Sequence, residues 1–194
     1  GRGFDVNFFN PVIFYRAVEF SRGSEAGNAL MGFNTKYKWT KTFSTYTQFV
    51  LDELTVGKFF DGTKYWGNKF AIQLGAKYYN AFDVENLYFQ GEFNVARPYT
   101  YANRKPILNY GHFNQSMAHL WGSNFSEAII IGRYHYNRWF ADAKLIFGMK
   151  GFDYNNGADN FSYGGDIYRN YNDRPFDSGV ELGQGIKTNT FYAN

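Results

Sequence analysis

The chain has 194 residues, a net charge of +3 and no cysteine, so it has no disulfide framework and no thiol chemistry. A charge this small argues against nucleic acid as a partner, because dedicated binders carry a strongly basic face. The longest apolar run, Ala128–Ile131, is far shorter than the ~20 residues of a membrane helix. Aromatic residues make up 22 % of the chain and 21 residues are glycine, a composition that favours strands over helices.

Eight strand-like runs follow one another along the chain. Most of them alternate between apolar and polar residues, an alternation that points successive side chains to opposite faces of a sheet. The runs are Asn10–Phe20, Ala29–Thr40, Phe43–Leu54, Phe70–Tyr79, Leu87–Ala96, Glu127–Asn137, Trp139–Lys150 and one that begins near Ile186. In the first run the pattern does not decide which residues share a face. The other runs predict a sheet with one apolar and one polar face.

The apolar faces of these runs are expected to meet lipid. They carry Phe49, Leu74, Phe89 and Phe147. The opposite faces carry Lys, Gln, Glu and Asp in strand after strand, which a water-filled lumen tolerates and a dry core does not. A soluble up-and-down barrel has the reverse arrangement, with an apolar interior, and stays an alternative.

The connections between the runs alternate in length. Lys41-Thr42, Ala81–Asn86 and Asn137-Arg138 are short, whereas Ser21–Asn28, Thr55–Lys69, Arg97–Ser126 and Gly151–Gly185 are longer. Tight turns at one end and long loops at the other are typical of outer-membrane barrels. A sandwich has no reason to sort its loops by end. The sequence therefore predicts an all-β, transmembrane antiparallel β-barrel, an up-and-down meander that forms one domain over residues 1–194.

Aromatic residues gather at the ends of the runs. They are Trp39, Phe43, Tyr78, Tyr79, Tyr136, Trp139 and Phe140. Two belts of aromatic residues at the two membrane interfaces would explain these positions. Ordinary β-propensity explains the number of aromatic residues but not where they stand.

Glu85–Gly91 reads ENLYFQG, the recognition sequence of tobacco etch virus protease. In a recombinant chain such a match indicates the remnant of a tag. Here the segment lies in the middle of the chain, and its alternation continues through Phe93 and Val95. These features favour a native strand.

The loop from Arg97 to Ser126 holds residue types that an outer-membrane hydrolase would use, namely His112, Ser116 and His119. A nucleophile needs a base within hydrogen-bond reach and a third group that orients the base, and nothing in this spacing demands such an arrangement. The histidines also lack a third metal ligand at a telling spacing. We therefore expect no catalytic residue, no metal site and no cofactor.

The long loops combine aromatic rings with Asn, Gln and Arg, which suits sugars, since a sugar ring has an apolar C–H face and a rim of hydroxyls. The candidate glycan contacts are Arg97, Tyr99, Tyr101, His112, Asn114, Gln115 and Trp66. Arg97 would hold the carboxylate of an acidic sugar in a fork of two hydrogen bonds. The alternative is that this loop folds inward and plugs the lumen, with both tyrosines packed beneath other loops and Arg97 paired to Glu92 or Asp52.

The central loop also carries a resemblance. Its segments Arg97–Tyr101, His112–Gln115, Ala118-His119 and Gly122–Phe125 resemble the capsule-assembly Wzi-type outer-membrane β-barrel family, in its gliding-motility-associated RemB-like branch. Trp121 stands where the family pattern has a proline. Family members are larger barrels, so the resemblance implies that the chain is an incomplete arc, about eight strands of a larger barrel.

The resemblance also implies a function: a non-enzymatic surface barrel in the outer membrane of a Gram-negative bacterium. Such a barrel attaches capsular polysaccharide or exopolysaccharide, or belongs to a gliding-motility or adhesion complex. The expected partners are outer-membrane lipid, one of these polysaccharides, and other surface-motility or secretion proteins, with no nucleic acid. A general diffusion porin is the alternative, and an outer-membrane hydrolase is the third possibility.

Overall fold

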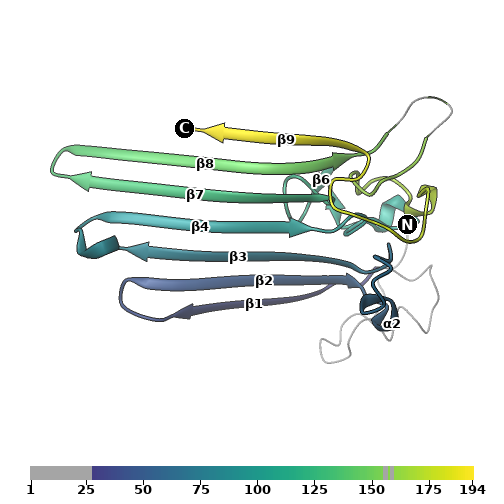
Figure 1. Cartoon of the computed structure of the whole chain (residues 1–194), viewed down its shortest axis with the longest axis horizontal. Coiled ribbons are helices and arrows are strands. Elements are labelled where there is room, and N and C mark those ends of the chain that lie inside the picture. The colour runs from purple at the N-terminus through teal and green to yellow at the C-terminus, as the bar shows by residue number, and fades with distance from the viewer. Residues whose placement is uncertain (1–27, 155–156, 158–159) are drawn as a thin grey trace.

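The structure, a computed structural model, describes residues 28–154, 157 and 160–194. A seven-stranded antiparallel sheet dominates it (Figure 1). In order across the sheet, the strands are β1 (Met31–Lys38), β2 (Phe43–Glu53), β3 (Lys69–Tyr79), β4 (Leu87–Ala96), β7 (Phe125–Tyr136), β8 (Trp139–Phe152) and β9 (Ile186–Ala193). Each long strand thus pairs with the long strand before it in the chain, which makes the fold an all-β meander.

The remaining elements are short and lie in the connections. β5 (Gly111–His112) and β6 (Gln115–Ser116) form a small hairpin. The others are the helical turns α2 (Val56–Phe59), η3 (Ala81–Asp83), η4 (Pro106–Leu108) and η5 (Tyr171–Asp173). In the described part of the chain, no helix is long and apolar enough to cross a membrane.

The predicted strands agree with the observed ones wherever the structure describes them. The differences are at the ends: β1 is Met31–Lys38 rather than Ala29–Thr40, β7 begins at Phe125 rather than Glu127, and β8 continues to Phe152 rather than Lys150. The other ends differ by at most one residue. The predicted strand Asn10–Phe20 lies outside the described residues. Leu87–Gly91 of the ENLYFQG segment lies in β4 and pairs with β3 on one side and β7 on the other, which confirms that this segment is a strand.

The sheet has one apolar and one polar face, as the alternation predicts. The exposed apolar side chains on the first face include Phe33, Leu74, Phe89, Phe93, Ile130, Phe147 and Phe191. Leu74 is 48 % exposed and Phe147 is 47 % exposed, while Phe49 on the same face is half-buried. A continuous apolar surface of this kind marks contact with a membrane or a partner.

Glycine lets large side chains cross the polar face. Gly75 of β3 stands between Tyr46 of β2 and Glu92 of β4 in the strand register. The Tyr46 ring lies over Gly75, where a Cβ would overlap it, and the Tyr46 hydroxyl donates a hydrogen bond to Glu92. The missing side chain at Gly75 therefore allows a direct contact between two strands that are not neighbours.

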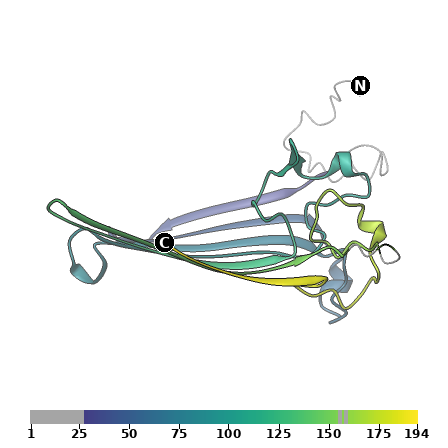
Figure 2. The same cartoon turned by 90° about the horizontal axis from the view of Figure 1, so that it is seen from above.

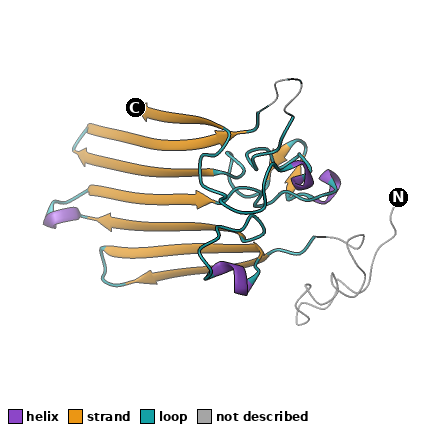
Figure 3. Cartoon of the chain, turned by 45° about the vertical axis from the view of Figure 1, so that its right-hand side comes forward, coloured by secondary structure: helices purple, strands orange, loops and turns teal. Residues whose placement is uncertain are grey.

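The connections are sorted by length between the two ends of the sheet, as predicted (Figures 1 and 3). The turn end holds residues 39–42, 80–86 and 137–138, and the opposite loop end holds residues 54–68, 97–124 and the described residues of 153–185. The predicted connection Ser21–Asn28 lies outside the described residues except for Asn28. The seven aromatic residues expected to form two belts all lie at the turn end; they are Trp39, Phe43, Tyr78, Tyr79, Tyr136, Trp139 and Phe140. In the strand register, Tyr79 and Phe140 lie on the polar face, opposite to Tyr78 and Trp139. The prediction of two belts from these residues is therefore wrong.

The sheet is twisted and open at both sides (Figure 2). Within the described residues, β1 and β9 each pair with one neighbour only, so no closed barrel is formed by this part of the chain. Every residue of both strands is exposed. Two such edges leave backbone N–H and C=O groups available for pairing.

Candidate functional site

Three long connections meet at the loop end of the sheet, and together we call their described residues the cap: residues 54–68, 97–124, 153–154, 157 and 160–185 (Figure 3). Backbone hydrogen bonds join them to one another. Tyr99 N donates to Gly164 O at 3.2 Å, and Val180 N donates to Lys64 O at 3.0 Å. The cap is therefore one packed unit and not three independent loops.

Three of the candidate sugar-binding rings lie inside the cap. Trp66 is 8 % exposed, Tyr101 is 2 % exposed and Tyr99 is completely buried. The rings of Trp66 and Tyr99 pack edge to face with centroids 6.0 Å apart, and the Tyr99 hydroxyl donates to Ser162 O at 2.8 Å. Burial raises the pKa of the Tyr99 phenol above its ordinary value, so the group stays a donor. Trp66 and Tyr99 pack in one buried cluster and have no free face for a sugar. Tyr101 packs against Ala96 and Phe125 of the sheet, so it joins the cap to the strands.

Arg97 turns into the cap and not toward a ligand. Its Nη2 donates to Tyr65 O at 3.2 Å, and burial lowers its pKa. The ion pair expected with Asp52 or Glu92 is wrong, because the carboxylate of Asp52 lies 3.4 Å from the Lys69 ammonium and that of Glu92 accepts from Tyr46 and Asn94. Tyr99 and Tyr101 are both buried as the alternative prediction held, but Arg97 has a different partner. The predicted plugging of a lumen stays a prediction.

Asn124 anchors the cap to the sheet and was missed by the sequence analysis. It is completely buried and has a left-handed backbone with φ of 58°. Its Nδ2 donates to the carbonyls of Gly151, Tyr163 and Gln184, and its Oδ1 accepts from Gly183 N at 2.8 Å. The only signal in the sequence is the Asn in the Gly122–Phe125 pattern, just before β7, because Asn tolerates a positive φ better than most residues.

Lys150 is a second anchor. Its ammonium donates to the backbone carbonyls of Trp121, Ser123 and Gly165. These carbonyls come from two different cap loops, so one side chain at the end of β8 joins both loops to the sheet. A lysine at the end of a strand carries no sequence signal for this role.

The hairpin β5–β6 carries the candidate residues that remain accessible, since His112, Asn114 and Gln115 are all exposed. The Tyr168 hydroxyl donates to Gln115 O at 3.0 Å and fixes the hairpin against the turn at residues 165–168. Between the hairpin and this turn lies a cavity of about 220 Å³, which we call the outer hollow. Its lining includes Asn114, Gln115, Trp121 and Asp166.

A row of amide side chains crosses the polar face of the sheet beneath the same loop. Asn34, Gln48, Gln73 and Asn94 are successive partners in the register from β1 to β4, and the row continues to Glu127 of β7. We call the first four side chains the amide row. The alternation along each predicted run puts all four on polar faces, but alternation alone does not reveal that they stand side by side.

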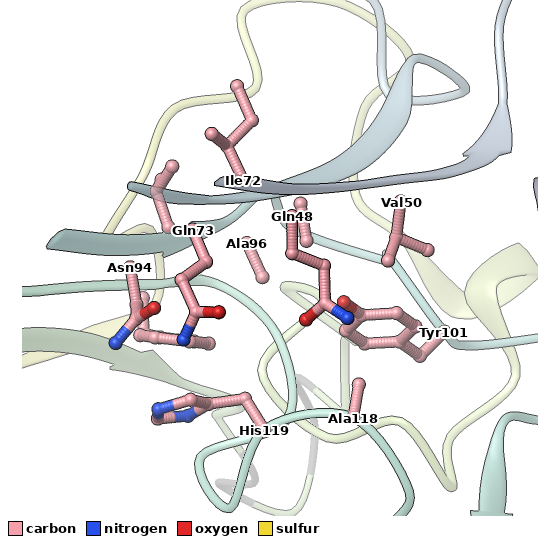
Figure 4. Close-up of a pocket in the computed structure, with 12 residues that line it drawn as sticks. Gln48, Val50, Ile72, Gln73, Asn94, Ala96, Tyr101, Ala118 and His119 are labelled. Carbon is pink, nitrogen blue, oxygen red and sulfur yellow. The ribbon is translucent and has the colours of Figure 1, made fainter. Parts of the chain in front are cut away.

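Two adjoining cavities separate the amide row from the segment Met117–His119 above it. Their volumes are about 90 and 500 Å³, and the four amide-row residues contribute to their lining. Figure 4 shows Gln48 and Gln73 pointing toward Ala118 and His119, while Ile72 points to the other side of the sheet. We call this space the inner groove.

The histidines of the loop make structural contacts. His119 Nε2 lies 2.7 Å from Glu127 Oε1, and the His112 ring packs against Phe113 with centroids 4.2 Å apart. Ser116 Oγ is buried and has no hydrogen-bond partner among the described residues. No group of three or more Asp, Glu or His side chains in that part of the chain is placed to hold a metal ion.

The fold and the cap define an all-β protein with an open, two-faced antiparallel sheet that carries interlocked loops at one end. Comparisons of the chain with models of protein families, with curated proteins and with solved structures gave no match. The function is therefore argued from the geometry of the sheet and the cap.

Proposed function

We propose that the chain is part of a non-enzymatic surface barrel in the outer membrane of a Gram-negative bacterium. In this proposal the barrel attaches a capsular polysaccharide or exopolysaccharide to the cell surface, or takes part in a gliding-motility or adhesion complex. The observation that supports it best is the combination of an exposed apolar face, an opposite polar face and long loops gathered at one end. Outer-membrane barrels have this arrangement, with lipid outside, a polar lumen inside and loops toward the exterior.

The open edges of the sheet support an arc of a larger barrel. A free edge strand with exposed backbone groups is a site of unwanted pairing, and barrels remove this problem by closing. β1 and β9 are such edges within the described residues. In our proposal, further strands pair with them and complete the wall.

The outer hollow is the proposed contact surface for the glycan. Asn114 and Gln115 offer amide donors and acceptors to sugar hydroxyls. Trp121 and Tyr168 line the same hollow with aromatic rings, which suit the apolar faces of sugars. Of the predicted glycan contacts, Asn114 and Gln115 line the outer hollow, and His112 lies beside them on the hairpin. The buried rings of Trp66, Tyr99 and Tyr101 are not part of this surface.

Binding of polysaccharide to the reconstituted protein tests the proposal. We expect proteoliposomes that carry the full chain to bind the extracted surface polysaccharide of the source bacterium. Replacing both Asn114 and Gln115 by alanine should weaken binding about tenfold, because each lost hydrogen bond costs about 0.5–1.5 kcal/mol. Arg138→Ala, at the turn end of the sheet, is the matched control and should bind like the wild type. Equal binding by all three proteins contradicts the proposed contact surface.

Conductance in a planar bilayer separates the proposal from a general diffusion porin. A steady open channel with no polysaccharide binding would favour the porin. The cap supports low conductance, because its loops are packed together at the end of the polar face. The third possibility is a hydrolase. Support for it would be a lipase activity of the wild type that Ser116→Ala abolishes.

A further inference from the structure

We infer that the inner groove is a second binding site, which takes an extended chain of neutral, hydroxyl-bearing sugar units. The ligand would lie along the amide row, across β1 to β4, beneath the segment Met117–His119. The class of ligand rests on the proposed function, whereas the site consists of residues that do not line the outer hollow.

The amide row has hydrogen-bonding groups to spare. In the described part of the chain, the side chains of Asn34, Gln48 and Gln73 form no hydrogen bond. The Asn94 Nδ2 donates to Glu92 and to Glu127, each at 2.9 Å, and its Oδ1 accepts no bond from the described residues. A primary amide both donates and accepts, and so does a sugar hydroxyl.

The spacing of the row suits a polymer. Neighbouring strands lie ~4.8 Å apart, so the amides of β1 to β4 recur at about that interval across the sheet. A repeating chain of sugar rings offers hydroxyls at a similar, regular interval. One ligand that follows the row therefore meets the amides of several strands.

The walls of the groove add an apolar strip beside the polar row. Val50, Ala71, Ala96 and Phe125 are successive register partners one row toward the cap, and they line the same two cavities. Amides on one side and apolar groups on the other match the hydroxyl rim and the C–H face of a sugar ring.

The groove is blocked at its β7 end. The contact between His119 and Glu127 closes the row there, and the Trp121 ring lies over Gly148, the next position in the register. A ligand would therefore enter from the side of β1, where the larger cavity lies.

The charge of the groove selects against acidic sugars. The described residues that line the two cavities include no Lys or Arg. The carboxylates of Glu92 and Glu127 are both bonded to Asn94 of the row, and a ligand carboxylate would meet their negative charge. Arg97, expected to hold an acidic sugar, faces Tyr65 instead.

Saturation-transfer NMR on the purified full chain tests the inference with maltohexaose, cellohexaose and isomaltohexaose as neutral probes and hexagalacturonate as the acidic probe. We expect at least one neutral probe to bind and hexagalacturonate not to bind. The double variant Gln48→Leu, Gln73→Leu should weaken neutral binding at least tenfold. Thr190→Leu is the control, because Thr190 pairs with Gly148 in the same register row but lies outside both cavities.

The double alanine variant at Asn114 and Gln115 makes the two proposals distinguishable. Loss of probe binding in the glutamine variant alone supports the inner groove. Loss in the hairpin variant alone overturns the inner groove and leaves the outer hollow standing. Three other results overturn the inference: unchanged binding in the glutamine variant, tighter binding of hexagalacturonate than of the neutral probes, or no binding of any neutral probe. The groove is then a space for water only.

Discussion

Replacing Asn124 by alanine tests the idea that its buried amide is one of the anchors that hold the cap to the sheet. The substitution removes a donor to three backbone carbonyls and an acceptor for Gly183 N. Of these carbonyls, that of Tyr163 keeps a second donor, Gln184 Nε2 at 2.8 Å. The change therefore deprives one N–H group and two carbonyls of this partner inside the cap.

The cost follows from these contacts. A buried N–H without a partner costs about 1–3 kcal/mol, and the two carbonyls together add a similar amount. An alanine in the left-handed region at φ of 58° costs about 1–2 kcal/mol more. We expect the free energy of opening the cap to fall by about 3–8 kcal/mol. Since each 1.4 kcal/mol is a factor of ten, cap amides should exchange at least a hundredfold faster with solvent deuterium.

Hydrogen exchange resolved by peptide gives the measurement. Faster exchange should be confined to the cap amides, among them Tyr99 N and Val180 N, while amides in the middle of β4 keep the wild-type rate. Asn114→Ala is a matched control, because Asn114 also has a positive φ, 59°, but is exposed. This control has only the backbone cost of about 1–2 kcal/mol and should accelerate exchange by about 5- to 30-fold.

Asn124→Gly separates the two contributions, because glycine accepts the left-handed backbone but cannot replace the amide. It should retain most of the effect of alanine. If Asn124→Ala and Asn114→Ala accelerate exchange equally, the hydrogen bonds of Asn124 do not hold the cap, and the reasoning is refuted.

The strands were predictable because their signal is local. Apolar and polar residues alternate within each run, and the period of two places Leu74 and Phe89 on one face whatever the rest of the chain does. The sorting of loops by length was visible for the same reason, since it needs only the order of runs. Strand ends were less certain because Phe125 and Phe152 join the sheet by pairing with Ala96 and Ile186 of other strands, and the run itself does not reveal those partners.

The cap was not predictable, because exposed and buried loop residues look alike in sequence. Tyr99 and Tyr101 stand among polar residues, which fits a binding surface as well as a packed loop. Their burial depends on residues far along the chain, such as Ser162, which accepts from Tyr99. The amide row was hidden for a related reason: Gln48 and Gln73 become neighbours only through the strand register.

Three further predictions concern the sheet itself. Tobacco etch virus protease should leave the folded chain intact and cut within Glu85–Gly91 only after denaturation, because β4 is paired on both sides and a protease binds its substrate as a free extended strand. Gel electrophoresis after timed digestion shows the result. Cleavage of the folded chain contradicts the central position of β4. Gly75→Ala should lower the free energy of unfolding in urea by about 1–3 kcal/mol, because the new Cβ overlaps the Tyr46 ring. Gly91→Ala is the control and should leave the urea midpoint nearly unchanged, because its Cβ meets no atom within 4 Å. Equal midpoints for the two variants would mean that Tyr46 does not lie across Gly75. Leu74→Arg should lower the free energy of unfolding in a lipid bilayer by about 2–4 kcal/mol, because this exposed side chain near the middle of β3 would face hydrocarbon in the proposed barrel. Lys77→Gln on the polar face should leave the free energy of unfolding nearly unchanged. Unfolding titrations in vesicles measure both variants, and a silent Leu74→Arg with a severe Lys77→Gln would mean that the apolar face does not meet lipid, so that the membrane proposal fails.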